Sequence, residues 1–266
     1  MIDSYGRTID YLRISVTDRC NLRCAYCMPP EGVRLFRHEA ILTFEEITEV
    51  ARTAAARGVT KIRLTGGEPL VRRDVVRLVG MLAGIEGVRD LAMTTNGTLL
   101  AAHAQPLAAA GLRRVNISLD AIDAARYAAI TRGGDVRQVM AGIDAARQAG
   151  LTPIRLNCVV AADSAEADAQ DVTRFAAACG LEVRFIRRMN LSAGSFAVVE
   201  GGLGGDCPRC DRLRLSSDGR IRPCLLSNLY FSVRELGAAE ALTRAVAAKP
   251  RAGSACTDLS MHAIGG

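Results

Sequence analysis

Short apolar runs alternate with longer amphipathic stretches through the first two thirds of the chain. The runs are rich in β-branched residues, which is typical of buried strands. They begin near Leu12, Lys61, Asp90, Arg114, Ile154 and Glu182. Strand–helix units repeated at this interval build a parallel sheet with right-handed crossovers. We therefore expect an α/β fold, an incomplete (β/α)6 TIM-like barrel, with an open doubly wound sheet as the alternative that periodicity does not exclude.

The stretches between these runs carry helix start and stop signals. Thr43 to Glu46 forms a capping box, Asp74 and Asp135 precede further helical patterns, and Gly58 follows the first of them. These signals predict helices over residues 44–57, 75–82, 101–110, 136–149 and 166–178.

The character of the chain changes after Met189. Residues 192–206 are rich in Gly, Ser and Ala, with four glycines between 201 and 205, which is typical of a flexible connection. We expect a first domain over 1–189, a Gly-rich linker over 190–206 and a second small unit over 207–266, which holds one helix from about 233 to 248.

Composition and charge narrow the class of protein. No apolar run approaches the ~18 residues that would span a bilayer, and residues 1–10 lack the apolar core of a signal peptide. We expect a cytoplasmic protein that binds no membrane. The net charge of +6 is commonplace, but aromatic residues make up only 4% of the chain and Trp is absent. That composition argues against a nucleic-acid surface built on base stacking.

Nine cysteines are many for 266 residues, and three of them form the spacing C-x3-C-x2-C at Cys20, Cys24 and Cys27. Three thiolates can ligate three irons of a 4Fe-4S cluster and leave the fourth iron open. Zinc normally takes four protein ligands, and no fourth lies close in sequence. The spacing therefore favours a cluster, with three structural cysteines or part of a zinc site as the alternatives.

A second group follows in Cys207, Cys210 and Cys224. An Asp-Gly turn at 218–219 predicts a hairpin that brings Cys224 back beside the other two. A zinc site would need a fourth ligand, for which Cys256 is only a candidate. Three ligands again favour a cluster with an open iron.

Basic residues recur at alternate positions of the predicted strands, so that several point to one face of the sheet. The residues that share one face of a predicted strand are Arg13 and Ser15, Lys61 and Arg63, Arg155 and Asn157, and Arg212 and Arg214. Several cations inside a barrel imply a phosphate-rich ligand, because guanidinium groups bind phosphate bidentately. The alternative is that some of them lie at exposed strand edges.

The first cysteine group, with Tyr26 before its last Cys, resembles the cluster loop of the radical S-adenosylmethionine (SAM) superfamily. The segments Thr65-Gly66-Gly67-Glu68-Pro69, Thr94-Thr95-Asn96-Gly97 and Ser118-Leu119-Asp120 resemble further motifs of that superfamily. The resemblance implies a 4Fe-4S cluster on Cys20, Cys24 and Cys27 and a SAM site. It implies that the residues that bind SAM are Tyr26, Gly66, Gly67, Glu68, Thr94, Ser118 and Met189.

Taken together, the two cysteine groups, the superfamily motifs and the basic residues are similar to those of the GTP 3′,8-cyclase family of molybdenum cofactor biosynthesis. The distinguishing features are C-x2-C-x-R-x-R at 207–214, the later Cys224 and the terminal Ile264-Gly265-Gly266. The resemblance implies a second 4Fe-4S cluster on Cys207, Cys210 and Cys224, with GTP bound between the clusters. It implies that Gly265 and Gly266 line the pocket and take part in catalysis. The triphosphate would meet Arg13, Lys61, Arg63, Arg155, Arg184, Arg212 and Arg214.

The implied reaction is a radical one that removes hydrogen from ribose C3′ and joins that carbon to C8 of guanine. The implied partners are GTP, a reduced electron donor such as flavodoxin or ferredoxin, and the downstream cyclic pyranopterin monophosphate synthase. A homodimer is compatible with the resemblance.

The match has three departures. Only seventeen residues separate Met189 from Cys207, where family members have a longer segment that covers the sixth strand. Arg187 stands where the family usually has Glu, and Arg155 where it usually has Lys. Two alternatives therefore stay open: a radical SAM enzyme acting on another substrate, and a non-catalytic cluster-binding relative.

Overall fold

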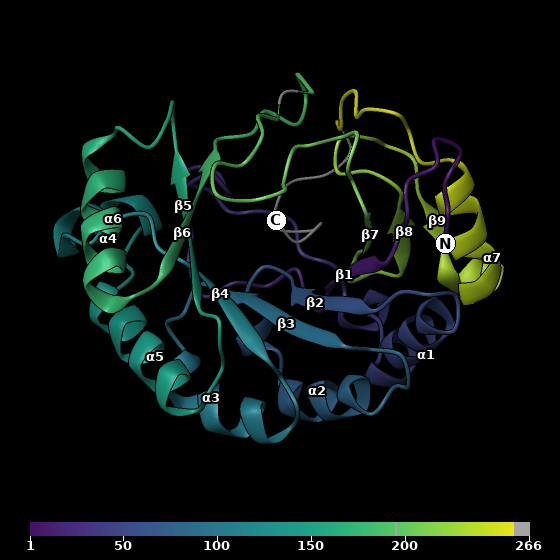
Figure 1. Cartoon of the computed structure of the whole chain (residues 1–266), viewed down its shortest axis with the longest axis horizontal. Helices are drawn as coiled ribbons and strands as arrows, with labels where there is room; N and C mark the ends of the chain where they lie inside the picture. The colour runs from purple at the N-terminus through teal and green to yellow at the C-terminus, as the bar shows by residue number, and fades with distance from the viewer. Residues whose placement is uncertain (195, 258–266) are drawn as a thin grey trace.

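A computed structural model describes residues 1–194 and 196–257, and its strands form one sheet in the order β6-β5-β4-β3-β2-β1-β7-β8-β9. The strands are β1 (Tyr11–Ser15), β2 (Lys61–Thr65), β3 (Asp90–Thr95), β4 (Arg114–Ser118), β5 (Arg155–Val160), β6 (Glu182–Arg187), β7 (Arg212–Leu215), β8 (Arg220–Arg222) and β9 (Phe231–Ser232). Strands β1 to β6 are parallel, as the alternating pattern predicts, and the curved sheet is an open, incomplete barrel (Figure 1).

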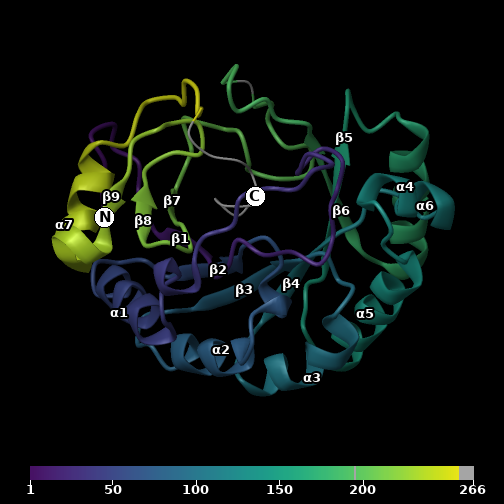
Figure 2. The same cartoon turned by 180° about the vertical axis from the view of Figure 1, so that it is seen from behind.

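The α-helices lie outside this sheet and form a continuous outer layer (Figures 1 and 2). They are α1 (Phe44–Ala55), α2 (Val75–Ala83), α3 (Leu100–Ala109), α4 (Ala124–Thr131), α5 (Val136–Gln148), α6 (Ala167–Cys179) and α7 (Val233–Ala247). Two 3₁₀ turns, η1 (His38–Ala40) and η2 (Pro69–Val71), lie in the loops after β1 and β2. The apolar core fills the space between sheet and helices, with Leu12, Ile62 and Val115 almost wholly buried.

Local signals explain where most of these helices begin. The hydroxyl of Thr43 accepts a hydrogen bond from Glu46 N (3.1 Å), and the Glu46 carboxylate accepts one from Thr43 N (2.7 Å), so the predicted capping box is present. Asp135 caps α5 through Arg137 N. Asp74 differs from its prediction: it has a left-handed backbone (φ 59°) and its side chain makes no cap hydrogen bond.

The C-terminal part of the chain continues the barrel sheet. β7 pairs in parallel with β1, with Arg13 opposite Arg214 in register. β7 and β8 form the predicted hairpin, and Gly219 in its turn has φ 86°. β1 therefore has a neighbour on each side, β2 from the start of the chain and β7 from near its end.

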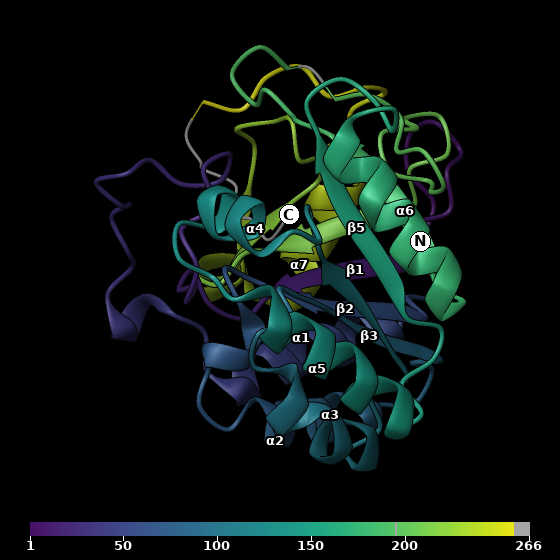
Figure 3. The ribbon, with the colours of Figure 1, turned by 90° about the vertical axis from the view of Figure 1, so that its left-hand side faces the viewer.

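The opposite edge of the sheet is β6, which is only partly covered. α6 packs against β5 and β6 (Figure 3), and Phe185 of β6 exchanges two backbone hydrogen bonds of 3.1 Å with Glu200. Between β6 and β7 the described residues contain no helix, which agrees with the expectation from the short connection. No helix among the residues that the structure describes is both long enough and apolar enough to cross a membrane.

Candidate functional site

Among the residues that the structure describes, three cavities are lined by strands of the sheet and the loops that join them. The first thiol cavity is lined by Cys20, Cys24 and Cys27, and the second thiol cavity by Cys207, Cys210 and Cys224. A third, the arginine cavity, has a volume of about 270 Å³ and a wall of basic side chains. The structure therefore brings each predicted cysteine group together, as the sequence spacing implied.

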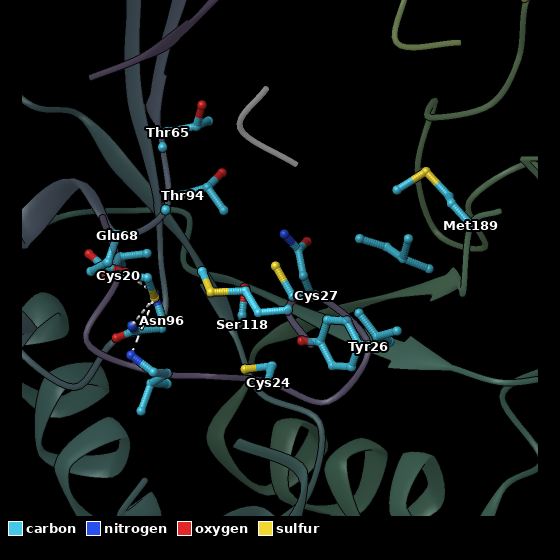
Figure 4. Close-up of a pocket in the computed structure, with 18 of the residues that line it drawn as sticks. Cys20, Cys24, Tyr26, Cys27, Thr65, Glu68, Thr94, Asn96, Ser118 and Met189 are labelled. Carbon is cyan, nitrogen blue, oxygen red and sulfur yellow. Dashed lines mark hydrogen bonds between the residues drawn. The ribbon is translucent and has the colours of Figure 1, made fainter. Parts of the chain in front are cut away.

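The loop after β1 turns its three thiols into the first thiol cavity (Figure 4). The sulfur of Cys20 accepts hydrogen bonds from Leu22 N (3.4 Å) and from the side-chain amide of Asn96 (3.8 Å). Donors to a ligating sulfur tune a cluster's potential. Asn96 was not among the predicted site residues, because an Asn-Gly pair by itself indicates only a turn.

The protonation of these thiols bears on what they can hold. Burial raises the pKa of Cys24 to about 12 and that of Cys27 to about 11, and nearby anionic groups add to both shifts. Three thiolates so close together need a bound cation to hold them deprotonated. The donor set is therefore suited to a metal cluster, which supplies that positive charge.

Glycines let the loop after β2 lie against the segment that leads into Cys20. A Cβ on Gly66 would lie 2.5 Å from Thr17 O, and one on Gly67 would lie 2.3 Å from Arg19 O. Gly67 N donates to Thr17 O and Glu68 N to Arg19 O, both at 2.8 Å. The Gly-Gly pair is thus required by close backbone contact, and it fixes the base of the cysteine loop.

The predicted residue Glu68 is buried, and its carboxylate is used by the protein itself. It accepts hydrogen bonds from Leu70 N (3.0 Å), Thr95 Oγ1 (2.8 Å) and Asn96 N (2.6 Å). Burial raises the pKa of Glu68 to about 7 despite these donors. Glu68 also lines the first thiol cavity, and its hydrogen bonds to Thr95 and Asn96 position the end of β3.

Tyr26 is fixed by a residue that the sequence analysis did not assign. Its hydroxyl donates a 2.7 Å hydrogen bond to Asp120, whose other oxygen accepts one from Val159 N (2.8 Å). Burial raises the pKa of Tyr26 well above its usual value, and the Asp120 carboxylate adds to this shift. The phenol therefore stays protonated, and its ring forms a fixed wall of the cavity (Figure 4).

The remaining predicted SAM residues, Thr94, Ser118 and Met189, line the same cavity from β3, β4 and the end of β6 (Figure 4). The hydroxyl oxygen of Thr94 is buried and has no hydrogen-bond partner in the described residues. A buried hydroxyl without a partner is costly, which is consistent with a site built for a polar ligand. These residues fit SAM beside a cluster.

The arginine cavity contains six of the seven predicted substrate residues. Those six are Arg13, Lys61, Arg63, Arg184, Arg212 and Arg214. Arg114 also lines the cavity and was missed, although the alternation rule applies to it as well, since it lies on the same face of β4 as Asn116. The cavity has two lining carboxylates: Asp90, which pairs with Arg114, and Asp211, which pairs with Lys61 and Arg212.

Arg155 is the exception and is removed from the candidate anion site. It does not line the cavity, and its guanidinium pairs with Glu182, its register partner on β6. This partner lies on the next strand, 27 residues away in the sequence.

Mutual repulsion and burial make the arginine cavity a strong anion site. Burial lowers the pKa of Arg214 to about 10, and Arg212 adds to the shift; burial likewise lowers the pKa values of Arg63 and Arg184. The Nε atoms of Arg63 and Arg184 are buried and make no hydrogen bond with the residues that the structure describes. An anion with several oxygens would satisfy these donors and offset the repulsion.

The second thiol cavity holds its cysteines beside a buried cation. Burial alone would raise the pKa of Cys210, but the nearby Lys249 ammonium lowers it below its usual value. No three metal-binding side chains of the described residues are grouped tightly enough to hold a single ion. The three cysteines that line each thiol cavity match the number of protein ligands of a 4Fe-4S cluster with one open iron.

The arginine cavity lies between the two thiol cavities and shares lining residues with each. It shares Asn157, Ile186 and Met189 with the first, and Phe196, Leu203, Arg212, Arg214 and Leu225 with the second. The arginine cavity therefore borders both thiol cavities. Gly265 and Gly266, the predicted tail of the site, lie outside the described residues.

A sequence comparison matches residues 14–176 to the Radical SAM superfamily. The GTP 3′,8-cyclase of Moorella thermoacetica is 41% identical over 304 residues, covering 94% of this chain and 94% of that protein. The GTP 3′,8-cyclase of Geobacter sulfurreducens is 39% identical over 324 residues, covering 100% of this chain and 99% of that protein. That alignment exceeds the 266 residues of this chain by 58 positions, so the relative carries internal segments that this chain lacks.

Solved structures share the fold at low sequence identity. One described as native anSMEcpe with bound AdoMet has a TM-score of 0.61 and 14% identity, covering 82% of this chain and 75% of that chain. Streptococcus suis SuiB bound to S-adenosylmethionine has a TM-score of 0.56 and 19% identity, covering 69% of this chain and 41% of that chain.

Proposed function

This chain belongs to the GTP 3′,8-cyclase family of the radical SAM superfamily, and from that premise we propose which ligand each of its three cavities binds. The protein is a radical SAM lyase that converts GTP to (8S)-3′,8-cyclo-7,8-dihydroguanosine 5′-triphosphate in molybdenum cofactor biosynthesis. Its cofactors are two 4Fe-4S clusters and SAM. When bound, the first cluster and SAM supply the one-electron chemistry that starts the reaction.

The first thiol cavity is the SAM site. Cys20, Cys24 and Cys27 hold the first cluster, and Tyr26, held by Asp120, forms a wall against the ligand. The Thr94 hydroxyl gains in SAM the partner that it lacks in the protein. The remaining SAM contacts come from Gly66, Gly67, Glu68, Ser118 and Met189.

The arginine cavity is the triphosphate site. The basic groups that bind the phosphates are Arg13, Lys61, Arg63, Arg114, Arg184, Arg212 and Arg214. Because they lie on several strands of one sheet, they hold the phosphates rigidly and thereby orient the sugar and base. Cys207, Cys210 and Cys224 would hold the second cluster, which would supply an open iron for the guanine.

One observation carries the proposal: the arginine cavity borders both thiol cavities. A nucleotide anchored there by its phosphates can place its ribose toward the first cluster and its base toward the second. Burial inside the barrel also shields the reacting carbon from water.

Anaerobic incubation of the reconstituted protein with GTP, SAM and dithionite tests the proposal. The cyclised guanine nucleotide, detected by mass spectrometry, is the expected product. Formation of 5′-deoxyadenosine without a guanine product would instead indicate another substrate, and formation of neither would indicate a non-catalytic relative.

The proposed cellular setting follows the same family. The electron donor is a reduced flavodoxin or ferredoxin, the consumer of the product is cyclic pyranopterin monophosphate synthase, and the compartment is the cytoplasm, where thiols stay reduced. A homodimer is a further proposal that size measurements in solution test.

A further inference from the structure

Lys249 is a buried lysine on the wall of the second thiol cavity, two residues beyond the end of α7. Only 3% of the residue is exposed. A buried ammonium is costly unless its three N–H donors have partners. Its Nζ donates to the backbone oxygens of Arg212 and Pro223, each at 2.7 Å, and it hydrogen-bonds the Cys210 side chain. Three partners for three donors fix this side chain in one position.

The two backbone oxygens belong to opposite arms of the β7–β8 hairpin. Arg212 begins β7, two residues after Cys210, and Pro223 follows β8 directly before Cys224. Lys249 therefore links the arm that carries Cys210 to the arm that carries Cys224.

The hairpin opens at this point. Its described pairs end at Arg214 opposite Arg222, and continuing the ladder would place Arg212 opposite Cys224. Pro223 has no N–H with which to continue it. The arms separate there, and the cysteines line the space between them. Lys249 thus supplies hydrogen bonds to both arms just beyond the last described strand pair, where the arms separate around the cavity.

We propose that Lys249 is a positioning residue for the second cluster: it sets the separation of the two cysteine arms and places a positive charge beside the cluster. This inference rests on the proposed function, which assigns a cluster to these cysteines. A fixed positive charge stabilises the more negative, reduced form of a cluster and so raises its reduction potential.

Two substitutions separate the two parts of this role. Lys249→Met removes both the donors and the charge, whereas Lys249→Gln removes the charge and keeps two of the three N–H donors on a side chain one atom shorter. Arg244→Met is the matched control, because it removes an exposed positive charge from the last turn of α7, where Arg244 pairs with Glu240 and lines neither the arginine cavity nor the second thiol cavity.

The measurement uses a full-length parent in which Cys20, Cys24 and Cys27 are all changed to Ala, so that only the second cluster is observed. We expect Lys249→Met to lower the bound iron at least twofold. We expect Lys249→Gln to keep most of the iron and to shift the reduction potential to a lower value in a titration followed by electron paramagnetic resonance. Arg244→Met should match the parent in both readouts.

Parental iron and parental potential in both Lys249 variants would overturn the role of Lys249 and leave the proposed function intact. If Lys249→Met does not fold, Lys249→Gln alone decides, and an unchanged potential in it overturns the electrostatic role. A parent that holds no more iron than a chain also lacking Cys207, Cys210 and Cys224 rejects the second cluster itself. That last result rejects the proposed function together with this inference, so the two failures are distinguishable.

Discussion

The hydroxyl of Thr95 donates a 2.8 Å hydrogen bond to the carboxylate of Glu68, and this bond joins the loop after β2 to the end of β3. The neighbouring Asn96 donates its backbone N–H to the same carboxylate at 2.6 Å and its side-chain amide to the sulfur of Cys20. The buried carboxylate of Glu68 therefore joins two loops of the first thiol cavity, and the side chain of Asn96 extends the link to the cysteine loop.

The buried carboxyl group of Glu68 should make the free energy of unfolding depend on pH. Burial raises the pKa of Glu68 from 4.5 to about 7, so the folded chain binds more protons than the unfolded chain between these values. Stability should therefore fall as pH rises from about 4.5 to about 7, by on the order of 3 kcal/mol. Anaerobic urea unfolding across this range should show the fall in the parent and a flatter profile in Glu68→Gln. Parallel profiles would contradict the assignment.

Substitution of Cys24 by Ala should remove the first cluster alone. A cluster of this kind carries four irons, so we expect bound iron to fall from about eight to about four per chain. Cys179→Ala is the matched control, because Cys179 ends α6 and lines neither thiol cavity. Equal iron in the Cys24 variant and the parent would remove these thiols from the cluster assignment.

The arginine cavity predicts which arginines bind the nucleotide. Arg63→Met removes a buried guanidinium with an unpartnered Nε, and a charge-assisted hydrogen bond contributes ~1.5–3 kcal/mol, so GTP binding should weaken ~10- to 100-fold. Arg155→Met should weaken it less than about threefold, because Arg155 pairs with Glu182 outside the cavity. Anaerobic calorimetry of GTP binding compares the two, and equal losses would contradict the placement of Arg155.

Gly67 and Gly80 should respond in opposite directions to the same substitution. Gly67→Ala places a Cβ 2.3 Å from Arg19 O, so it should lower the unfolding temperature and the iron bound by the first cysteine group. Gly80 lies exposed within α2, with nothing within 4 Å of an added Cβ, so Gly80→Ala should stabilise the protein by about 0.5–1 kcal/mol. Thermal unfolding and iron analysis measure both effects. A stable, iron-replete Gly67→Ala protein would show that the loop contact is not required.

The sequence predicts much of this arrangement because its signals are local. The strands of the barrel, the capping box of Thr43, the hairpin turn at Gly219 and the spacing of each cysteine group all depend on residues that are near one another in the chain. The start of β2 at Lys61 was predicted without error for the same reason.

The remaining features depend on contacts between distant residues. Only the structure shows that the Arg155 guanidinium is ion-paired with Glu182, or that the Tyr26 hydroxyl donates a hydrogen bond to Asp120. The parallel pairing of β7 with β1 also has no local signal, since residues about two hundred positions apart meet there. Arg114 could have been predicted from the sequence, because strand alternation places it on the same face of β4 as Asn116.

The position of β1 between β2 and β7 has a consequence for biosynthesis on the ribosome. Residues 212–215 leave the ribosome long after residues 11–15, so one edge of β1 stays without its partner through most of translation. Because Arg212 and Arg214 arrive on the same late strand, the anion-binding wall is incomplete until then. A nascent chain interrupted before this strand could retain the thiols of Cys20, Cys24 and Cys27 while lacking the half of the chamber that faces them.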